Sequence, residues 1–232
     1  MARSKSPARQ EYGFFKCKSH SVYARDTFDR WMSIRYPDVP WCRYADDGLL
    51  HCRSREQAEF ILKEISKRFE ECGLKIHPEK TKIAYCKDAN RKENHLNNEF
   101  TFLGYTFKSR LAMNNKGQFF MSFIPAISDK AMKLIKYKIK HEWKLDHKTN
   151  LELIELATKI NPIIRGWYHY YGKFYKSKMQ KISRYINDKI CKWFRRKYLG
   201  GNISLTKSFE WIKRVYKANN RLFEHWKDWK FV

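Results

Sequence analysis

The chain is poor in acidic residues and has no long apolar run. Its 24 Asp and Glu stand against 49 Lys and Arg, which gives 232 residues a formal net charge of +25. No segment approaches the roughly 18 uninterrupted apolar residues that a membrane-spanning helix needs. The basic N-terminus also lacks the apolar core of a secretory signal. We therefore expect no membrane partner, and neither a transmembrane nor a secreted protein.

Paired cysteines, repeats and linkers are also missing. The six cysteines are scattered, with no C-x-x-C pair and no cysteine–histidine cluster at zinc spacing. This pattern predicts reduced thiols and no structural zinc. The sequence has no internal repeat. It also has no low-complexity stretch that would serve as a long linker. The length suits one large domain or two small ones, with a substantial core.

Basic charge and aromatic rings are plentiful. Phe, Trp and Tyr make up 16% of the residues, and they are interleaved with the surplus of Lys and Arg. Positive charge neutralises phosphates, and rings stack on bases. Nucleic acid is therefore the leading class of partner.

Two adjacent carboxylates, Asp46 and Asp47, stand between two short apolar runs, Trp41–Tyr44 and Gly48–Cys52. The pattern predicts a β-hairpin whose turn is formed by Asp-Asp-Gly. Neighbouring carboxylates repel each other unless a cation lies between them, and Mg²⁺ prefers oxygen ligands. Such pairs hold the metals of two-metal nucleotidyl transfer. An ordinary surface hairpin with an acidic turn remains the alternative.

The remaining periodicities predict an α+β half followed by a helical half. A helix is predicted over Ala24–Trp31, with Phe28, Trp31 and Met32 on one apolar face. A second helix begins at a Ser54/Gln57 capping box and ends before Gly73. Strands are predicted at Lys82–Cys86 and at Phe100–Phe107, with a loop between them. After Ser128 every element reads as a helix, with Pro162 opening a new one. The predicted divisions are a polar basic arm (1–23), an α+β domain (24–125) and an all-α basic domain (126–232).

Four ordered motifs resemble bacterial group II intron reverse transcriptases, also called maturases. Arg43–Asp47 is similar to the palm motif that holds the catalytic metals in that family, and Gly73–Lys82 to the palm segment after it. Phe102–Tyr105 resembles the primer-gripping hairpin, and Asn161–Gly172 the opening of the maturase-specific thumb. The resemblance implies a partial polymerase palm followed by a helical thumb, in a bacterial cytoplasmic protein.

The resemblance also implies roles for individual residues in the α+β half. Asp46 would bind Mg²⁺ with Asp47 beside it, and Lys80 would lie near the nucleotide phosphates. Tyr44 would stack under the primer terminus, and Gly104 would bring backbone close to the primer. The alternatives are cross-strand packing for Tyr44, a solvated side chain for Lys80 and a β-bulge for Gly104.

In the helical half, one face is predicted to contact RNA. The candidates on α-helical spacing are Arg165, His169 and Lys173, while Ile164, Trp167 and Tyr171 would face the core. A second basic group would bind RNA or simply complement a helix end. It consists of Arg195, Arg196 and Lys197. Trp193 and Phe194 are interpreted as packing anchors between helices.

The sequence departs from the family in one respect, because only about 45 residues precede the carboxylate pair. The family's fingers region and further metal-binding aspartate would lie upstream of it. We therefore expect RNA-directed DNA polymerase chemistry as the parent function, with Mg²⁺ held weakly or not at all and no activity of this chain alone. The expected partners are group II intron RNA or an RNA/DNA duplex, and a separate N-terminal reverse transcriptase half. A non-catalytic RNA-binding splicing cofactor and a truncated mobile-element relic are the alternatives.

Overall fold

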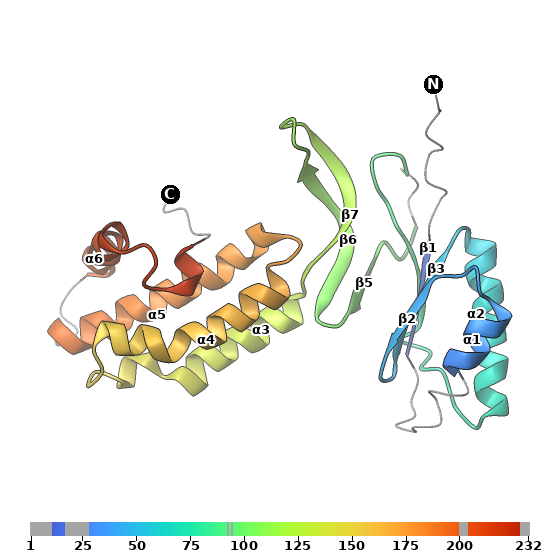
Figure 1. Ribbon diagram of the computed structural model, residues 1–232, viewed down its shortest axis with the longest axis horizontal. Helices are drawn as coiled ribbons and strands as arrows, with labels where there is room; N and C mark the ends of the chain where they lie inside the picture. Colours follow the sequence, from blue (N-terminus) through green and yellow to red (C-terminus); the bar gives the residue numbers. More distant parts are fainter. Residues whose placement is uncertain (1–10, 17–27, 92, 94, 200–203, 228–232) are drawn as a thin grey trace. The chain divides into compact units, whose positions relative to one another are not determined.

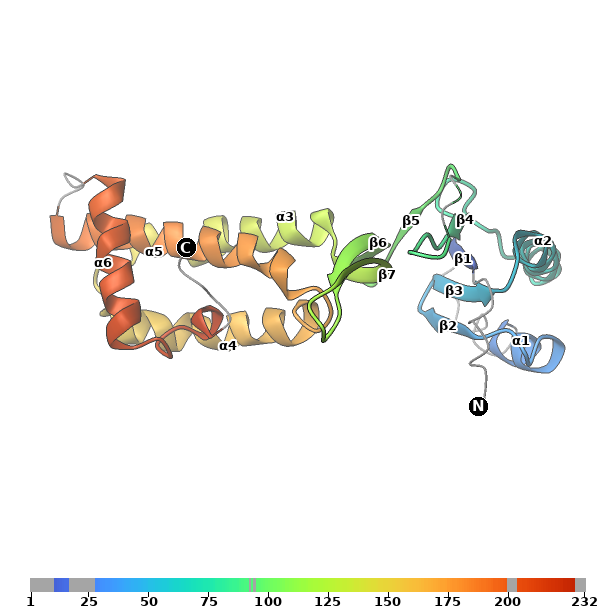
Figure 2. The same cartoon turned by 90° about the horizontal axis from the view of Figure 1, so that it is seen from above.

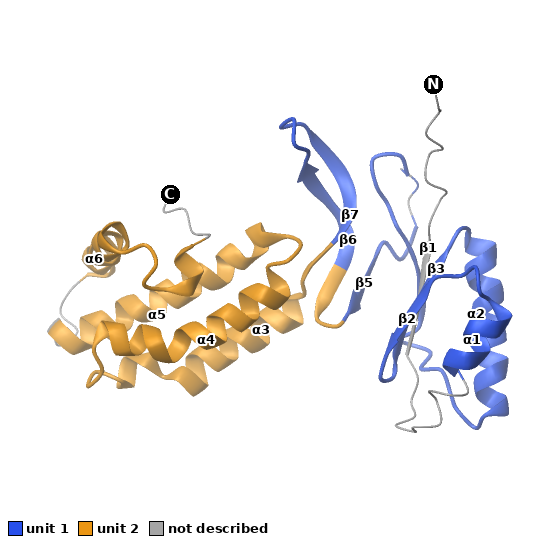
Figure 3. Cartoon of the chain, viewed as in Figure 1, with its two compact units in different colours: residues 1–102, 107–124 blue, residues 103–106, 125–232 orange. Residues whose placement is uncertain are grey.

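The computed structural model describes residues 11–16, 28–91, 93, 95–199 and 204–227 (Figure 1). The chain forms two compact units (Figure 3). Unit 1 comprises Met1–Phe102 and Phe107–Ile124, and unit 2 comprises Leu103–Thr106 and Pro125–Val232. None of the helices in the described ranges combines the length and the apolar character of a membrane span.

Unit 1 contains a four-stranded antiparallel sheet in the order β2-β3-β1-β4. Its strands are β1 (Glu11–Lys16), β2 (Trp41–Tyr44), β3 (Asp47–Cys52) and β4 (Lys82–Tyr85). The predicted strand after the second helix is therefore confirmed, one residue shorter than expected. The sheet gives a β-α-β-β-α-β order in which β1 lies between β3 and β4, as in a split βαβ fold.

The polar basic arm predicted over 1–23 is wrong for residues 11–16, because β1 is a central strand of the sheet. A six-residue segment offers too little sequence for a periodicity to stand out. It becomes a strand because β3 and β4 each provide a row of backbone partners, and together these satisfy both of its edges. The remainder of the predicted arm lies outside the described residues.

The helices α1 (Arg30–Arg35) and α2 (Arg55–Glu71) lie on the same side of this sheet (Figure 2). Phe28 and Met32 are buried against the α2 residues Ile61, Ile65 and Phe69. The apolar face predicted for the first helix is therefore confirmed at Phe28 and Met32. Within the described residues α1 extends past the predicted end at Trp31, to Arg35, and residues 24–27, where the predicted helix would begin, lie outside the described ranges.

The ends of α2 are largely as predicted. Ser54 Oγ accepts a hydrogen bond from the Gln57 amide at 3.2 Å. The Gln57 side chain bonds the Arg53 amide at 2.6 Å rather than that of Ser54, so the reciprocal half of the capping box is displaced by one residue. At the other end Gly73 adopts a φ of +68°, and the Leu74 amide donates to the Phe69 carbonyl at 2.7 Å. This is a Schellman ending.

A second sheet contains β5 (Glu99–Phe102), β6 (Tyr105–Met113) and β7 (Phe119–Ile127) in that order. The single strand predicted over Phe100–Phe107 is wrong, because the chain turns at Leu103 and Gly104. Both residues have positive φ angles, +50° and +78°. Two consecutive left-handed residues are typical of a tight hairpin turn. The alternating aromatic pattern continues across this turn, which is why it reads as one strand.

Unit 2 is built from helices around one apolar core. The structure confirms helices at each position predicted after Ser128, whose side chain caps the first of them at the Ala131 amide. Trp143 and Ile164 are among the buried core residues, and Trp167 packs against them. The elements are α3 (Asp129–Lys138), η2 (Ile139–Trp143), η3 (Leu145–His147), α4 (Leu153–Tyr171), η4 (Lys176–Met179), α5 (Gln180–Leu199), α6 (Leu205–Ala218) and η5 (Glu224–Trp226).

The prediction that Pro162 opens a new helix is wrong, because α4 continues through it. Proline removes one backbone hydrogen bond and usually kinks a helix. Here the buried residues Leu156, Ile160 and Ile164 follow one another at a spacing of four on both sides of the proline. Their continuous packing against the core offsets the lost bond.

Candidate catalytic hairpin and nucleic-acid interface

The predicted hairpin is confirmed, with its turn one residue earlier than expected. Tyr44 pairs with Asp47, so the two turn residues are Ala45 and Asp46, and Asp47 begins β3. Ala45 has a φ of +52°, a region that residues with a side chain seldom adopt. Such strain persists where surrounding contacts hold the backbone in place, and it is concentrated at functional sites.

Arg43 supplies those contacts. Its guanidinium binds both carboxylate oxygens of Asp29, each at 2.7 Å, and donates to the Ala45 carbonyl at 2.7 Å. A bidentate pair of this kind fixes orientation as well as adding energy. The acidic residue on the segment before α1 is therefore engaged in holding the turn. Both Asp29 oxygens accept from Arg43, and a cation bound there would lie beside the guanidinium charge, which disfavours this carboxylate as a third metal ligand.

The two candidate metal ligands are half-buried at the end of the sheet. Mg²⁺ is commonly held by one or two carboxylates, water and substrate phosphates. The two carboxylates therefore supply only part of its coordination shell. Within the described ranges no group of three or more His, Cys, Asp or Glu is placed to hold a metal. At the β1 position that pairs with Asp47 the sequence has Lys16, and Glu11 pairs with Cys52 at the far end of the strand.

Lys80 lies at the same end of the sheet as the carboxylate pair. In β4, Lys82 pairs with Phe14 of β1, and Phe14 pairs with Leu49 of β3. Lys80 comes two residues before Lys82, in an exposed turn that continues toward the level of Asp47. Strand β1 lies between β3 and β4, so the axes of β3 and β4 are about 10 Å apart. The prediction that Lys80 contacts nucleotide phosphates stays a prediction with a suitable position.

Tyr44 is 65% exposed on β2, an outer strand of the sheet. The residue opposite it is Asp47 rather than an aromatic or β-branched residue. Cross-strand aromatic packing therefore does not account for the tyrosine. Its ring is accessible for stacking, which leaves the primer-contact role as an untested prediction.

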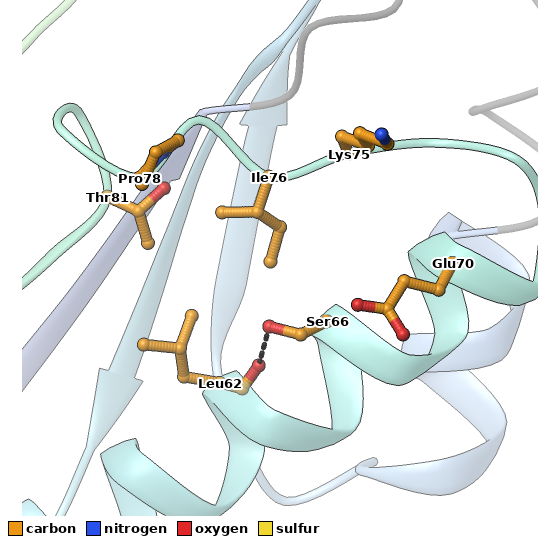
Figure 4. Close-up of a pocket in the computed structure, with 7 residues that line it drawn as sticks. All are labelled: Leu62, Ser66, Glu70, Lys75, Ile76, Pro78 and Thr81. Carbon is orange, nitrogen blue, oxygen red and sulfur yellow. Dashed lines mark hydrogen bonds between the residues drawn. The ribbon is translucent and has the colours of Figure 1, made fainter.

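An open pocket of about 440 Å³ lies between α2 and the segment before β4 (Figure 4). Ser66 donates to the Leu62 carbonyl at 2.8 Å on its helical wall, and Glu70 and Lys75 supply its charges. Neither the carboxylate pair nor Lys80 lines it. The pocket is therefore not the predicted catalytic site.

Gly104 is required by a close contact within unit 2. A Cβ at this position would lie 2.9 Å from Tyr171 Oη. Tyr170 Oη also donates to the Leu103 carbonyl at 2.9 Å, and Tyr105 Oη hydrogen-bonds the Tyr170 carbonyl. The β-bulge interpretation is wrong, because Gly104 is a turn residue. Within unit 2 Tyr171 approaches it, a residue that sequence reasoning placed only in the core, and the contact of Gly104 with a primer stays a prediction.

The RNA-binding residues predicted on α4 lie on the surface. Arg165, His169 and Lys173 are all exposed, and Lys173 falls just beyond the helix end. Arg165 lies 3.5 Å from Glu224, which partly neutralises it. On the opposite face Trp167 stacks on Trp143, with ring centroids 5.4 Å apart. The division of α4 into a core face and an exposed face is confirmed, while RNA contact itself stays a prediction.

The basic group near the end of α5 has a mixed environment. Lys197 Nζ donates to the Leu151 carbonyl at 2.6 Å and to Glu152 at 2.5 Å, and its side chain is only 11% exposed. The hydrogen bond to Glu152 raises the pKa of Lys197. Arg195 is half-buried, whereas Arg196 is exposed and lies 3.8 Å from Asp146. Lys197 therefore joins two segments of unit 2, and Arg196 is the accessible member.

The interpretation of Trp193 and Phe194 as packing anchors is confirmed. Trp193 is fully buried and its indole donates to the Lys148 carbonyl at 2.9 Å. Phe194 stacks on Trp211 of α6, with centroids 3.7 Å apart. These rings hold helices together and are not available to bases.

Sequence reasoning missed a buried polar cluster that attaches the C-terminal segment. The Asn187 side-chain oxygen accepts from His225 Nε2 at 2.8 Å and from Trp226 Nε1 at 2.9 Å. Asn161 donates to the Leu222 carbonyl and accepts from the Glu224 amide, both at 2.9 Å. Burial lowers the pKa of His225 to about 3. The only available signal was a polar residue on an otherwise apolar helix face at Asn187.

The order of strands and helices in unit 1, with adjacent carboxylates on a hairpin, is consistent with part of a nucleic-acid polymerase palm. Residues 19–107 match the family model described as reverse transcriptase (RNA-dependent DNA polymerase). Residues 132–214 match the family model described as group II intron, maturase-specific domain. The chain belongs to the group II intron reverse transcriptase/maturase family. A search of curated proteins found no match.

Proposed function

We propose that this chain binds group II intron RNA through unit 2 and does not polymerise DNA by itself. The family supports a reverse transcriptase/maturase function in general terms. The observation that carries the finer proposal is the composition of the sheet end around Asp47. The paired position in β1 is Lys16, and Asp29 is bound to Arg43. Two carboxylates alone are a weak Mg²⁺ site until substrate phosphates complete the coordination shell.

A second proposal follows from the residues that are suitably placed. Polymerisation would become possible if another polypeptide segment supplied a further carboxylate. The residues of this chain that would then take part are Asp46, Asp47, Lys80 and the exposed Tyr44. Bound Mg²⁺ would then stabilise charge on the attacking and leaving oxygens of nucleotidyl transfer. Lys80 would add positive charge beside the phosphates, and Tyr44 would support the primer terminus by stacking. An N-terminal reverse transcriptase half is the partner that this proposal requires.

Primer extension and RNA binding separate the two proposals. Purified chain and its Asp46→Asn variant are given an annealed RNA template and DNA primer with Mg²⁺ and nucleotides, beside a full-length reverse transcriptase as positive control. We expect no extension, and RNA binding that is equal in both chains and weakens steeply with salt. Extension that Asp46→Asn abolishes would contradict the first proposal. If adding the N-terminal half of a full-length family member restores extension that depends on Asp46, the second proposal holds.

A further inference from the structure

Two lysines from two helices lie over one tyrosine ring in unit 2, and two further lysines lie near them. Lys136 of α3 lies with Nζ 5.4 Å from the centroid of Tyr185, and Lys189 of α5 lies 5.5 Å from the same centroid. Lys140 lies in η2, four residues after Lys136, and Lys192 follows Lys189 by three residues on α5. We define these four residues, Lys136, Lys140, Lys189 and Lys192, as the lysine cluster.

The members of the lysine cluster influence one another electrostatically. Burial lowers the pKa of Lys189, and the positive charges of Lys192 and Lys140 lower it further. Burial raises the pKa of Asp188, against the attraction of Lys192, Lys136 and Lys189. Asp188 and Asp146 are the acidic groups that act on Lys189 from α5 and from η3. More positive than negative charge is therefore gathered at one place, which is unfavourable without a counter-anion.

The positive charge continues along α5. One face of α5 carries Tyr185, Lys189, Lys192 and Arg196, because these residues follow one another at spacings of four, three and four. The rise from Lys189 to Arg196 is about 10 Å at 1.5 Å per residue. Arg196 is 56% exposed, and Lys140 and Lys192 are exposed as well. A row of cations of this length suits a chain of phosphates better than a single small anion.

The cluster also differs from the basic residues that the sequence had suggested. Arg165 faces Glu224, and Lys197 is bonded to Leu151 and Glu152. None of the four cluster ammonium groups forms an ion pair with a carboxylate in the described part of the chain. Their charge is therefore available to a ligand without breaking an internal salt bridge. The cation–π contacts with Tyr185 hold Lys136 and Lys189 in place while leaving their charge intact.

We propose that the lysine cluster, extended by Arg196, is a binding surface for the phosphate backbone of RNA. This inference rests on the RNA binding proposed above and assigns it to a surface formed by α3, η2 and α5. Ammonium groups act on phosphates as point charges and do not read base edges, so the surface contributes affinity rather than sequence specificity. Asp188 lies within the surface and weakens its attraction for the RNA.

The test compares two variants that remove the same charge. The cluster variant carries Lys136→Gln, Lys140→Gln, Lys189→Gln and Lys192→Gln. The control variant carries Lys→Gln at four exposed lysines on α4 and α6, namely Lys159, Lys207, Lys213 and Lys217. Affinity for a labelled RNA hairpin with a duplex stem is measured from about 50 to 200 mM salt. Removing one lysine that neutralises a phosphate is expected to reduce the log–log salt slope by about 1.

For the cluster variant we expect a slope smaller by about two to four and binding at least about tenfold weaker at low salt. The control variant should change the slope by less than about one. The single change Asp188→Asn should act in the opposite direction and strengthen binding by roughly two- to tenfold at low salt, because it removes a negative charge from the surface. This variant keeps all four lysines, and circular dichroism checks that it is folded, so it remains informative if the cluster variant is unstable.

Two results would overturn the proposal. The first is an equal loss in the cluster and control variants, which would indicate nonspecific attraction by net charge. The second is unchanged binding by Asp188→Asn. If the unaltered chain itself does not bind the hairpin, the proposed RNA-binding function fails as a whole. If it binds with a steep salt dependence while the cluster variant resembles the control, only this surface is wrong.

Discussion

Polar side chains are used differently in the hairpin of unit 1 and in the helical core of unit 2. At the hairpin, Asp46 and Asp47 lie half-buried at the edge of the sheet, and Arg43 holds the turn from one side. In unit 2, Asn187 and His225 are fully enclosed and bonded to each other. The first arrangement keeps its charges accessible to a ligand, while the second uses its polar groups to specify the fold.

This difference predicts where substitutions will be costly. Buried polar groups that lose their partners keep the full penalty of burial, about 1–3 kcal/mol each. Charges at a partly exposed turn are solvated when a partner is removed, so their loss costs less. Stability should therefore depend strongly on the enclosed cluster and weakly on the hairpin.

The largest effect is expected at Asn187. Asn187→Leu removes the acceptor of both His225 Nε2 and Trp226 Nε1 and leaves two buried donors unsatisfied. The free energy of unfolding in urea should fall by about 3–5 kcal/mol. Asn150→Leu, at an exposed position, is the control and should change it by less than about 0.5 kcal/mol. A loss below about 1 kcal/mol at Asn187 would contradict the importance of the cluster.

Acid sensitivity should come from the same cluster. His225 is buried in its neutral form with a pKa of about 3, below the ordinary value of 6.5. The unfolded chain therefore binds a proton near pH 6.5 that the folded chain does not. The contribution of neutral His225 to the free energy of unfolding is therefore complete above pH 6.5, and it is lost as the pH falls toward 3. Between pH 6.5 and 5 the unfolding free energy should drop by up to about 1.4 kcal/mol per pH unit.

Urea unfolding across this range tests the assignment to His225. The His225→Gln variant should have a flatter pH dependence, whatever its absolute stability. His169→Gln removes an exposed histidine and should keep the slope of the unaltered chain. Equal slopes in both variants would mean that another group is responsible.

A smaller effect is expected at the turn between β5 and β6. Gly104 and Gly117 both have a φ of +78°, but only Gly104 has a neighbour where a Cβ would lie, Tyr171 Oη at 2.9 Å. Replacing either glycine by alanine strains the backbone, by about 1 kcal/mol. Gly104→Ala should cost about 1–2 kcal/mol more than Gly117→Ala in thermal or urea unfolding, because of the added overlap. Equal losses of stability in the two variants would show that the Tyr171 side chain moves aside without destabilising the fold.

The smallest effect is expected at the hairpin. A double-mutant cycle with Arg43→Gln and Asp29→Asn should give a coupling energy of about 1 kcal/mol that decreases with salt. Arg55 and Glu59 are the comparison, since their atoms are also 2.7 Å apart but their side chains are 61% and 49% exposed. Their coupling should be about 0.3–0.5 kcal/mol. A hairpin coupling no larger than this would mean that the Arg43–Asp29 pair does not hold the turn.

Sequence patterns that act over a few neighbouring residues predicted local structure correctly. Ser54 and Gly73 marked both ends of α2, because caps and left-handed glycines act on the adjacent backbone. The hairpin was found for the same reason, although Ala45 displaced its turn by one residue. The carboxylate pair could be named from the motif, while the ion pair of Arg43 with Asp29 could not, since it joins residues 14 apart in sequence.

The sequence alone thus determined the hairpin, the capped helix, the buried faces of the thumb helices and the family. Tertiary structure decided that residues 11–16 form a central strand and that α4 passes through Pro162. It also turned Lys197 inward and brought lysines of α3 and α5 to one ring. The physical reason is that backbone pairing, core burial and charge clustering depend on partners far away in the chain. Those partners are chosen only when the whole unit packs.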